Sequence, residues 1–511
     1  MTTGLVYLIG AGPGDPGLIT VRGRDCLRRS EVVVYDYLAN PRLLDEVPVD
    51  ARRIYVGKTS GRHHLPQEQI NALLVELARQ GRIVARLKGG DPCVFGRGGE
   101  EACQLAAAGI PFEIVPGVTA AFGAALYAGI PLTHRDFTTS LGLFTGHEHP
   151  ARQISSLDWA KLATGVGTLV FYMGMANLEQ IAALLMAHGR HPDTPAAVIR
   201  WGTLPEQQTL VAPLREIAAQ VRRSGLRPPA IIIVGEVVAL RDQLRWFDRR
   251  PLFGRRILVT RSQEQAGALS AALEAAGARV LAVPTLEIVP PPDWTDLDGA
   301  LDRLAGTDFL VLTSTNAVES LLARLAARNL DSRALAGIVV AAIGSKTAAA
   351  LAGHGILADL QPARQDAEGM LEMLLEQGVA GGRILYPRSQ LARPLLVREL
   401  IAAGAEVTAP VAYHCRCPAA AAEPLRQALD DGVDAVAFAS SSALRHAWEL
   451  LDAGRRKLLQ GAVLASLGPQ TSATARELGL AVSVEADEPT AEALVAALGA
   501  HFSALSSAAR S

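Results

Sequence analysis

Two glycine-rich strings in the first hundred residues constrain the fold of this chain more than any other feature. The first, GAGPGD at 10–15, follows the apolar run VYLI, and the second, GGDPCVFGRGGEE at 89–101, follows IVARLK. Both lead into stretches with helical spacing, so each is a strand, a loop and a helix in succession. Two such units predict a doubly wound α/β domain with its ligand over the strand ends, where glycine lets the backbone approach closely.

The first string differs from the glycine loops that bind phosphates. Its glycines are Gly10, Gly12 and Gly14, with Pro13 stiffening the loop and Pro16 following it. A dinucleotide fingerprint needs another glycine spacing and an open helix N-terminus for the pyrophosphate, which Pro16 blocks. No Gly-Lys-Ser/Thr follows, as it does in a P-loop. By itself the string indicates only a tight turn of an α/β protein.

The length and composition of the chain exclude several classes of function. A chain of 511 residues is too long for one ordinary core and predicts two or more domains. Its net charge of −2 provides no overall basic field for nucleic acid. The N-terminus lacks the pattern of a signal peptide, and the apolar runs are too short to span a bilayer. We therefore expect a cytoplasmic protein without nucleic-acid or membrane partners.

The five cysteines are scattered and predict neither a disulfide framework nor a metal site. Only Cys415 and Cys417 lie close in sequence, and without a second pair or a histidine cluster they make a poor zinc site. An odd number of cysteines without a framework fits a reducing compartment. We predict no bound metal.

Short β-branched runs alternate with amphipathic stretches through both halves of the chain. Between the halves lies the charged, aperiodic stretch 243–256, and we place the linker within it at 249–254. The second half repeats a pattern in which strands ending in Thr, Ser or Gly open into helices, which predicts two similar lobes. In the first half the predicted strands are Val6–Ile9, Val32–Tyr35, Ile83–Leu87, Phe112–Val115, Thr168–Tyr172, Ala197–Arg200 and Ala230–Val234, and the predicted helices are Gln67–Arg79, Gly99–Ala107, Val118–Tyr127 and Leu178–Ala187.

Further motifs accompany the two glycine strings in the first half. They are VYD at 34–36, VGK at 56–58, PGVTA at 116–120, GIPLTHRD at 129–136 and FYMGM at 171–175. Taken together and in order across 4–248, these motifs resemble the tetrapyrrole methyltransferases, and among them uroporphyrinogen-III C-methyltransferase. The resemblance implies a domain over 1–248 with two α/β lobes and S-adenosylmethionine bound between them.

The resemblance places a set of mostly small or apolar residues against this cofactor. A sulfonium cation favours carbonyl oxygens and a carboxylate over a phosphate nest, and Asp91 offers a carboxylate that accepts hydrogen bonds from the cofactor. The alternative for Asp91 is a turn or helix-cap residue. The implied cofactor residues are Pro13, Gly89, Gly90, Asp91, Val94, Thr119, Ala120, Met173, Gly202 and Ala230.

Charged residues at strand ends supply the implied chemistry. Asp36 and Lys58 match positions that the family ties to catalysis. A carboxylate suits holding pyrrole N–H groups or taking a proton, and a lysine suits binding acetate or propionate arms. The alternatives are a helix cap for Asp36 and a solvated cation for Lys58. Arg86 and Arg97 are the predicted partners of the substrate carboxylates, or else solvated surface residues.

The second half carries, in order, RILVTR, TSTNAVESL, AIGSKTAAAL, YPRS, VAYHC, ASSSAL and LGPQTSATARELG. Together these strings resemble uroporphyrinogen-III synthase, which implies two α/β lobes joined by a two-strand hinge. Prolines near both expected crossings fit the hinge. The implied boundaries are 255–500 for the domain, 255–287 plus 419–498 for one lobe, 290–411 for the other, and 501–511 for a flexible tail.

Tyr413 matches a family tyrosine that assists departure of the substrate hydroxyl, because a phenol donates a proton. The family shows Tyr-x-Thr there, whereas this chain has Tyr-His-Cys, so the role of the third position does not carry over. The alternative for Tyr413 is a buried aromatic plug. Hydroxyl residues at helix starts suit carboxylate arms or, alternatively, are plain N-caps; they are Thr313, Ser314, Ser440 and Thr471.

The two resemblances together imply a bifunctional enzyme of tetrapyrrole biosynthesis. The second half is expected to cyclise hydroxymethylbilane to uroporphyrinogen III with inversion of the last ring. The first half is expected to transfer two methyl groups from S-adenosylmethionine to that product, giving precorrin-2 and S-adenosylhomocysteine on the way to sirohaem or cobalamin. A homodimer through the methyltransferase domain is a further expectation.

Two alternatives stay open from the sequence. One is a methyltransferase of the same fold that acts on another substrate. The other treats the second half as a two-lobed ligand-binding module without catalysis, because two lobes and a hinge also describe binding proteins.

Overall fold

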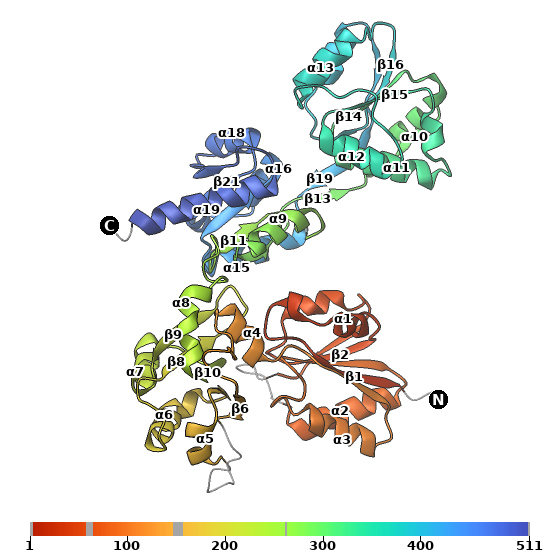
Figure 1. Cartoon of the computed structure of the whole chain (residues 1–511). Helices are drawn as coiled ribbons and strands as arrows, with labels where there is room; N and C mark the ends of the chain where they lie inside the picture. The colour runs from red at the N-terminus through yellow and green to blue at the C-terminus, as the bar shows by residue number, and fades with distance from the viewer. Residues whose placement is uncertain (1–3, 58–64, 147–156, 261–262, 509–511) are drawn as a thin grey trace. The chain divides into compact units, whose positions relative to one another are not determined.

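A computed structural model describes residues 4–57, 65–146, 157–260 and 263–508 of the chain (Figure 1). The chain divides into two compact units, each with its own sheets and cores. None of the helices in these described ranges is long and apolar enough to cross a membrane. Unit 1 comprises Met1–Arg255, Leu273–Arg279 and Gly499–Ser511, and unit 2 comprises Arg256–Ala272 and Val280–Leu498.

Unit 1 begins with a parallel five-stranded sheet in the order β3-β2-β4-β1-β5. Its strands are β1 (Leu5–Gly10), β2 (Val32–Tyr35), β3 (Arg52–Tyr55), β4 (Ile83–Lys88) and β5 (Phe112–Val115). Successive residues of β1 enter opposite cores, as the alternation of a strand requires. Val6 and Leu8 pack with α2 (Gln67–Arg79) and α3 (Gly98–Ala107), whereas Tyr7 and Ile9 pack with α1 (Val21–Arg28). Burial on both faces explains the unbroken apolar runs in the sequence.

The second sheet of unit 1 is mixed, in the order β6-β7-β10-β8-β9. Strands β6 and β7 are parallel, while β10 runs antiparallel to β7 and β8, and β9 antiparallel to β8. Helices α5, α6 and α7 pack on one face, and the small residues of α4 pack on the other. The bounds are β6 (Leu141–Thr145), β7 (Thr168–Tyr172), β8 (Pro195–Arg200), β9 (Gln208–Pro213), β10 (Ala230–Val234), α4 (Ala120–Tyr127), α5 (Trp159–Gly165), α6 (Leu178–Ala187), α7 (Leu214–Ser224) and α8 (Arg241–Leu244).

Unit 2 holds two parallel sheets and a short sheet that connects them along the chain. One parallel sheet has the order β12-β11-β20-β21-β22, and the other has the order β15-β14-β16-β18. The chain passes from the first to the second through β13 and returns through β19, and these two strands pair antiparallel. The bounds are β11 (Arg256–Val259), β12 (Arg279–Ala282), β13 (Glu287–Val289), β14 (Phe309–Leu312), β15 (Val339–Ala342), β16 (Arg383–Leu385), β17 (Arg388–Ser389), β18 (Glu406–Thr408), β19 (Val411–Arg416), β20 (Ala435–Phe438), β21 (Val463–Ser466) and β22 (Val484–Glu485).

Amphipathic helices cover the sheets of unit 2. Helices α10 to α12 pack on one face of β14 and β15, and α13 and α14 pack on the other side of that sheet. Helices α15 to α18 pack on β11, β20 and β21. The bounds are α9 (Gln263–Ala275), α10 (Thr295–Leu301), α11 (Thr315–Ala327), α12 (Ser345–Gly353), α13 (Ala367–Glu376), α14 (Leu395–Ala402), α15 (Ala422–Asp430), α16 (Ser441–Glu449), α17 (Ala453–Gly461), α18 (Pro469–Glu477) and α19 (Ala491–Ala508).

The end of the chain differs from the flexible tail predicted for 501–511. Helix α19 continues to Ala508, so most of that segment is helical. Alanine and leucine have high helix propensity, and the Phe502 ring is buried, which extends the helix beyond the expected end.

Candidate active sites

The two glycine strings lie side by side at the ends of β1 and β4. The Gly12 amide donates to the Gly90 carbonyl at 3.2 Å, and the Gly90 amide donates to the Gly12 carbonyl at 2.7 Å. Both residues have positive φ, 77° and 70°, a conformation that favours glycine. A Cβ at Gly117, after β5, would overlap the Gly90 carbonyl oxygen. Glycine at these positions therefore lets three strand-end loops meet backbone to backbone.

The Asp91 carboxylate organises the loop after β4. Its Oδ1 accepts from the amides of Cys93 at 2.8 Å and Val94 at 3.1 Å, and its Oδ2 accepts from the Gly117 amide at 3.1 Å. These contacts are typical of a turn residue, which was the alternative predicted for Asp91. They also join the loop after β4 to the loop after β5. The predicted hydrogen bonds from the cofactor to this carboxylate compete with three internal ones.

Side chains from the first sheet of unit 1 contact those of the second beside these loops. The Asp15 amide donates to Thr203 Oγ1 at 2.9 Å, and the Tyr127 hydroxyl donates to Asp15 Oδ2 at 2.7 Å. Burial, and then the hydrogen bond to Asp15, raise the pKa of Tyr127, so this phenol keeps its proton. Tyr172 Oη lies 2.6 Å from Thr119 Oγ1. The strand ends of the two sheets thus face one another across unit 1.

Strained backbone is concentrated in these same loops. Phe95, Arg97, Met173, Trp201 and Thr203 all have φ between 50° and 72°, although none is glycine. They follow the ends of β4, β7 and β8. Such conformations cost free energy and cluster at ligand-binding sites. Met173 is also 52% exposed, an unusual position for a large apolar side chain unless it faces a ligand.

The predicted cofactor residues all come to these strand ends. Pro13 and the residues from Gly89 to Val94 lie after β1 and β4, and Thr119 and Ala120 lie at the start of α4. Met173 and Gly202 follow β7 and β8. Ala230 begins β10, whose antiparallel direction brings it opposite Arg200 at the end of β8. Residues separated by more than 200 positions in sequence therefore share one edge of unit 1.

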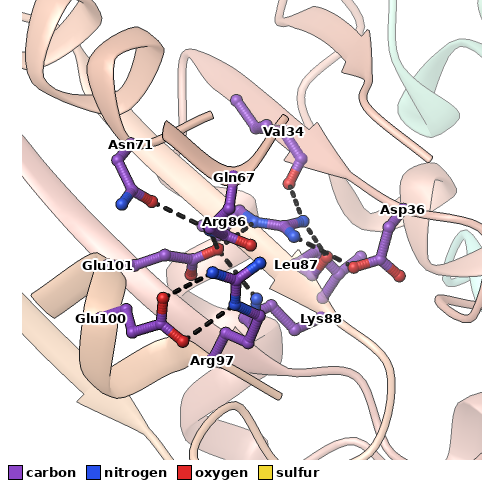
Figure 2. A network of polar contacts seen from close by, with 10 residues as sticks. All are labelled: Val34, Asp36, Gln67, Asn71, Arg86, Leu87, Lys88, Arg97, Glu100 and Glu101. Carbon is purple, nitrogen blue, oxygen red and sulfur yellow. Dashed lines mark hydrogen bonds and ion pairs between the residues drawn. The ribbon is translucent and has the colours of Figure 1, made fainter. Parts of the chain in front are cut away.

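Asp36 follows β2 at this edge and is held by a buried arginine (Figure 2). Its Oδ2 accepts from Arg86 Nη2 at 3.1 Å, and its Oδ1 accepts from the Leu38 amide at 3.2 Å. The Asp36 side chain is 26% exposed, so the carboxylate is anchored and still reachable. Lys58, the other predicted catalytic residue of this half, lies outside the described residues.

Arg86 was predicted to bind substrate carboxylates or, alternatively, to be a solvated surface residue, and the structure buries it. It is 3% exposed, and its guanidinium donates to Glu101 Oε1 at 3.2 Å and to the carbonyls of Val34 and Leu87 at 3.4 and 3.1 Å, besides Asp36. Residues at even spacing on a strand share a face, so Arg86 and Lys88 both point toward α3, which supplies Glu101. Arg86 therefore acts inside the protein, and Glu101 is a partner that the sequence reasoning missed.

Arg97, the other predicted substrate-binding arginine, remains exposed beside the loop after β4. Its Nε and Nη2 donate to the two carboxylate oxygens of Glu100 at 2.9 and 2.6 Å. This hydrogen bonding raises the pKa of Arg97 and lowers that of Glu100. An exposed ion pair of this kind contributes little stability. The guanidinium can therefore leave Glu100 and pair with another carboxylate.

In unit 2, Tyr413 on β19 is buried beside the loop after β14. Its hydroxyl lies 2.9 Å from Ser314 Oγ, and next to it the Tyr386 hydroxyl lies 3.3 Å from Thr313 Oγ1. Burial raises the pKa of Tyr413, so the phenol holds its proton at neutral pH. Tyr386 belongs to the YPRS string, which the sequence indicated only as a motif. The structure places its hydroxyl in the same cluster as Tyr413.

The other predicted hydroxyl residues of unit 2 behave as helix caps or stay in the core. Ser440 Oγ accepts from the Ala443 amide at 3.3 Å, and Thr471 is buried in the first turn of α18. Both belong to the sheet of β11, β20 and β21, whereas Tyr413 and Ser314 lie with β19 and β14. The structure therefore joins Ser314 to Tyr413 and Thr313 to Tyr386, but shows no such contact for Ser440 and Thr471 among the described residues.

The third residue of the Tyr-His-Cys string, Cys415, pairs with the neighbouring loop. Its amide donates to Gln390 Oε1 at 2.9 Å, and Gln390 Nε2 donates to the Cys415 carbonyl at 2.7 Å. Across the described part of the chain, no group of three or more His, Cys, Asp or Glu side chains is arranged to hold a metal ion.

Comparison with known proteins matches the two halves separately. The family model of Tetrapyrrole (Corrin/Porphyrin) Methylases matches residues 5–218, and that of Uroporphyrinogen-III synthase HemD matches residues 267–496. The chain is 42% identical over 362 residues to the porphyrin biosynthesis protein HemD of Ruminiclostridium josui, covering 71% of this chain and 72% of that one. It is 42% identical over 342 residues to the uroporphyrinogen-III C-methyltransferase of Bacillus subtilis, covering 67% of this chain and 70% of that one.

A solved structure is also similar to the first half. It is the uroporphyrin-III C-methyl transferase of Thermus thermophilus in complex with S-adenyl homocysteine, with 40% identity over 46% of this chain and 100% of that one, and a TM-score of 0.40.

Two α/β units, matched in order by these two families, define an enzyme with a methyltransferase domain followed by a synthase domain. The chain belongs to the family that joins a tetrapyrrole methylase to a uroporphyrinogen-III synthase, and it is an enzyme of tetrapyrrole biosynthesis. The family, the fold class and the two kinds of activity predicted from the sequence are confirmed. The domain limits and the individual site residues stay predictions.

Proposed function

We propose that unit 2 cyclises hydroxymethylbilane to uroporphyrinogen III and that unit 1 methylates this product twice, giving precorrin-2. S-adenosylmethionine is the proposed methyl donor. The observation that carries the proposal is the convergence of the predicted cofactor residues on one edge of unit 1, around the paired loops of Gly12 and Gly90. The family membership of the second half supports the same substrate, since that half makes it.

The residues at the strand ends of unit 1 fit the proposed donor. Gly90 has no side chain, and a Cβ there would face the Ala120 amide and the Thr119 Cα, so the surface between these predicted positions stays open. Exposed Met173 adds an apolar contact on the opposite side. When bound, S-adenosylmethionine supplies an electrophilic methyl group on a sulfonium centre. The chain supplies backbone groups and apolar surface. These surroundings suit a sulfonium cation better than a phosphate-binding nest would.

Asp36 is the proposed base or pyrrole-binding carboxylate. Arg86 and the Leu38 amide each occupy one oxygen, which fixes the orientation of the carboxylate at the strand end. A fixed carboxylate accepts hydrogen bonds from pyrrole N–H groups and takes up the ring proton that is lost after methylation. Lys58 is proposed to bind an acidic arm of the substrate.

Tyr413 is the proposed proton donor of unit 2. The C–O bond of the substrate hydroxymethyl group breaks, and the departing hydroxyl takes the Tyr413 proton and leaves as water. Its hydrogen bond with Ser314 orients the phenol. Thr313 and Ser314, which directly precede α11, are proposed to bind a carboxylate arm of the substrate. Folding the linear substrate so that its ends meet supplies the remaining acceleration.

The proposal is tested by a coupled assay on the full chain. Hydroxymethylbilane and S-adenosylmethionine are supplied together, and products are separated by mass and isomer. We expect dimethylated product derived from the type III isomer. Only the uninverted type I isomer would contradict the synthase role, and type III uroporphyrinogen without methylation would contradict the methyltransferase role.

A homodimer through unit 1 and a cytoplasmic location complete the proposal. Phe122, Leu126 and Trp246 expose apolar surface on and near α4, which favours association. All five cysteines are free thiols, which is compatible with the proposed reducing compartment. Sedimentation equilibrium of the full chain measures the dimer, and a monomer at micromolar concentration would contradict it.

A further inference from the structure

A buried carboxylate lies beneath Asp36 in unit 1. Glu101, in the first turn of α3, is 0% exposed, and its Oε1 accepts from Lys88 Nζ at 2.9 Å and from Arg86 Nε at 3.2 Å. Gln67 Nε2, at the start of α2, donates to the same oxygen at 3.0 Å. Figure 2 shows these side chains converging from β4, α2 and α3 on one point.

Stability alone does not explain this cluster. Removing charges from water is costly, and replacing a buried ion pair by apolar residues is often neutral or stabilising. Burial, and then the neighbouring Arg86, lower the pKa of the Lys88 ammonium, while Glu101 opposes this shift. An apolar core at this position would avoid these opposing effects. The cluster therefore needs a reason beyond packing.

The remaining donors of Arg86 supply that reason. Nη2 donates to Asp36, and Nη1 donates to the carbonyls of Val34 on β2 and Leu87 on β4. The side chains run from closed core to the strand ends: Glu101 is 0% exposed, Arg86 4%, and Asp36 26%. A planar guanidinium with its donors assigned on three sides cannot rotate without breaking several hydrogen bonds.

We propose that Glu101 and Lys88 are positioning residues for methyl transfer, which hold the Arg86 guanidinium in one orientation and through it the carboxylate of Asp36. The inference rests on the proposed function, in which Asp36 acts on the substrate. Lys88 also directly precedes Gly89, so the same buried pair fastens α3 to the start of the second glycine loop.

The test compares E101Q with a matched variant of the full chain, D248N. Glutamine keeps the size of Glu101 but loses the charge that two cations share. Asp248 also receives two cations, Arg241 Nη2 at 2.5 Å and Arg245 Nε at 3.1 Å, and it is largely buried. None of its described partners belongs to the Glu101 cluster. Thermal unfolding, kcat and KM for uroporphyrinogen III are measured for both variants.

We expect E101Q to lower kcat about 100-fold, as a misplaced catalytic group does, with KM within about threefold. D248N is expected to lose similar thermal stability with kcat within about threefold of the wild type. Because Glu101 acts through Asp36, the double variant D36A/E101Q is expected to match D36A. Wild-type kcat in E101Q, an equal loss in D248N, or a further loss in the double variant would each overturn the inference.

A second variant covers the case in which E101Q does not fold. R86K keeps the charge, but a lysine ammonium lacks the fork that joins Glu101 to Asp36. We expect the same loss of kcat in R86K, and full activity would overturn the inference. If D36A itself retains wild-type activity, the proposed function fails and not only the positioning role. If D36A is inactive while E101Q and R86K are fully active, only the positioning role fails.

Discussion

The two candidate sites of this enzyme differ in how their residues are held. In unit 1, glycine loops pair backbone to backbone, and Asp36 is anchored by a buried guanidinium that itself has several partners. In unit 2, Tyr413 has a hydrogen bond with Ser314, and that serine also caps α11. The first site is built on two long glycine-rich strings, and the second on common residues at common positions.

This difference has a chemical reason. Methyl transfer needs a donor and an acceptor carbon aligned closely, so misplacement is costly and the geometry must be rigid. Cyclisation of hydroxymethylbilane starts from a substrate that loses its hydroxyl readily, so folding the chain matters more than any one group. We therefore expect single substitutions to be severe in unit 1 and milder in unit 2.

The largest expected effect is that of D36A on methylation. Loss of the carboxylate should lower kcat about 1,000-fold, within the range of a general base. The synthase activity of the same chain should be unchanged, and it serves as the internal control. The measurement is the rate of methyl transfer to uroporphyrinogen III under single-turnover conditions. Methylation within tenfold of the wild type would show that Asp36 is only a strand-end cap.

The next effect is that of G117A on the paired loops. A methyl group there overlaps the Gly90 carbonyl and the Gly10 backbone, so the loops must separate. We expect unit 1 to lose about 2 kcal/mol of stability from overpacking and methylation to fall about 100-fold. G165A is the matched control, because nothing lies near a Cβ at that exposed position. Equal activity of the two variants would refute a close approach of these loops as a requirement.

A smaller effect is expected for Y413F in unit 2. Removing the phenolic hydroxyl should lower the rate of type III product formation about tenfold. This is less than a typical general acid contributes, because the substrate hydroxyl leaves readily. The readout is the ratio of type III to type I uroporphyrinogen from hydroxymethylbilane, with methylation of added uroporphyrinogen III as control. An unchanged ratio and rate would assign Tyr413 to packing alone.

The pH dependence of the synthase tests the same residue by another route. Burial raises the pKa of Tyr413 above its ordinary value of 10.0, and the protonated phenol is the active form. Activity should therefore persist below that ordinary value and be lost only as pH rises through the raised pKa of the folded enzyme. The profile of kcat/KM against pH measures this, and Y413F should lack the alkaline loss. A loss centred near neutral pH would contradict the assignment.

The smallest effect is that of S440A. Ser440 caps α16 through the Ala443 amide, so alanine should cost about 1 kcal/mol of stability in unit 2 and change the type III rate less than about twofold. Chemical denaturation and the isomer assay measure the two quantities. A loss of rate as large as that of Y413F would support Ser440 as a substrate-binding residue.

Much of the fold was predictable because its signals are local. The strands Val32–Tyr35, Phe112–Val115, Thr168–Tyr172 and Ala230–Val234 have the predicted bounds, since each is a β-branched run between turn residues. Strands β3, β6 and β9 were not predicted, because runs such as RRIY, LGLFT and QTLVAP mix polar or flexible residues with apolar ones.

The candidate sites were predictable only in part. Pro13 and Gly90 could be recognised as loop residues from the sequence. Proline narrows the range of backbone conformations and glycine widens it wherever they occur. The burial of Arg86 was not predictable, because an arginine on a strand is ordinarily exposed unless a partner such as Glu101 faces it. Tyr386 shows the same limit in unit 2, since its contact with Thr313 spans 73 residues.

By itself the sequence determined the two families, the strand–loop–helix units and the glycine loops. Residue spacing and backbone preference are local properties that can be read from neighbouring residues. Only the tertiary structure decided that β1 lies beside β4 and that Gly12 pairs with Gly90. It also decided that Arg86 links the carboxylates of Glu101 and Asp36. Strand order and helix placement bring together residues that sequence separates, and a charge becomes buried or exposed only once they are set.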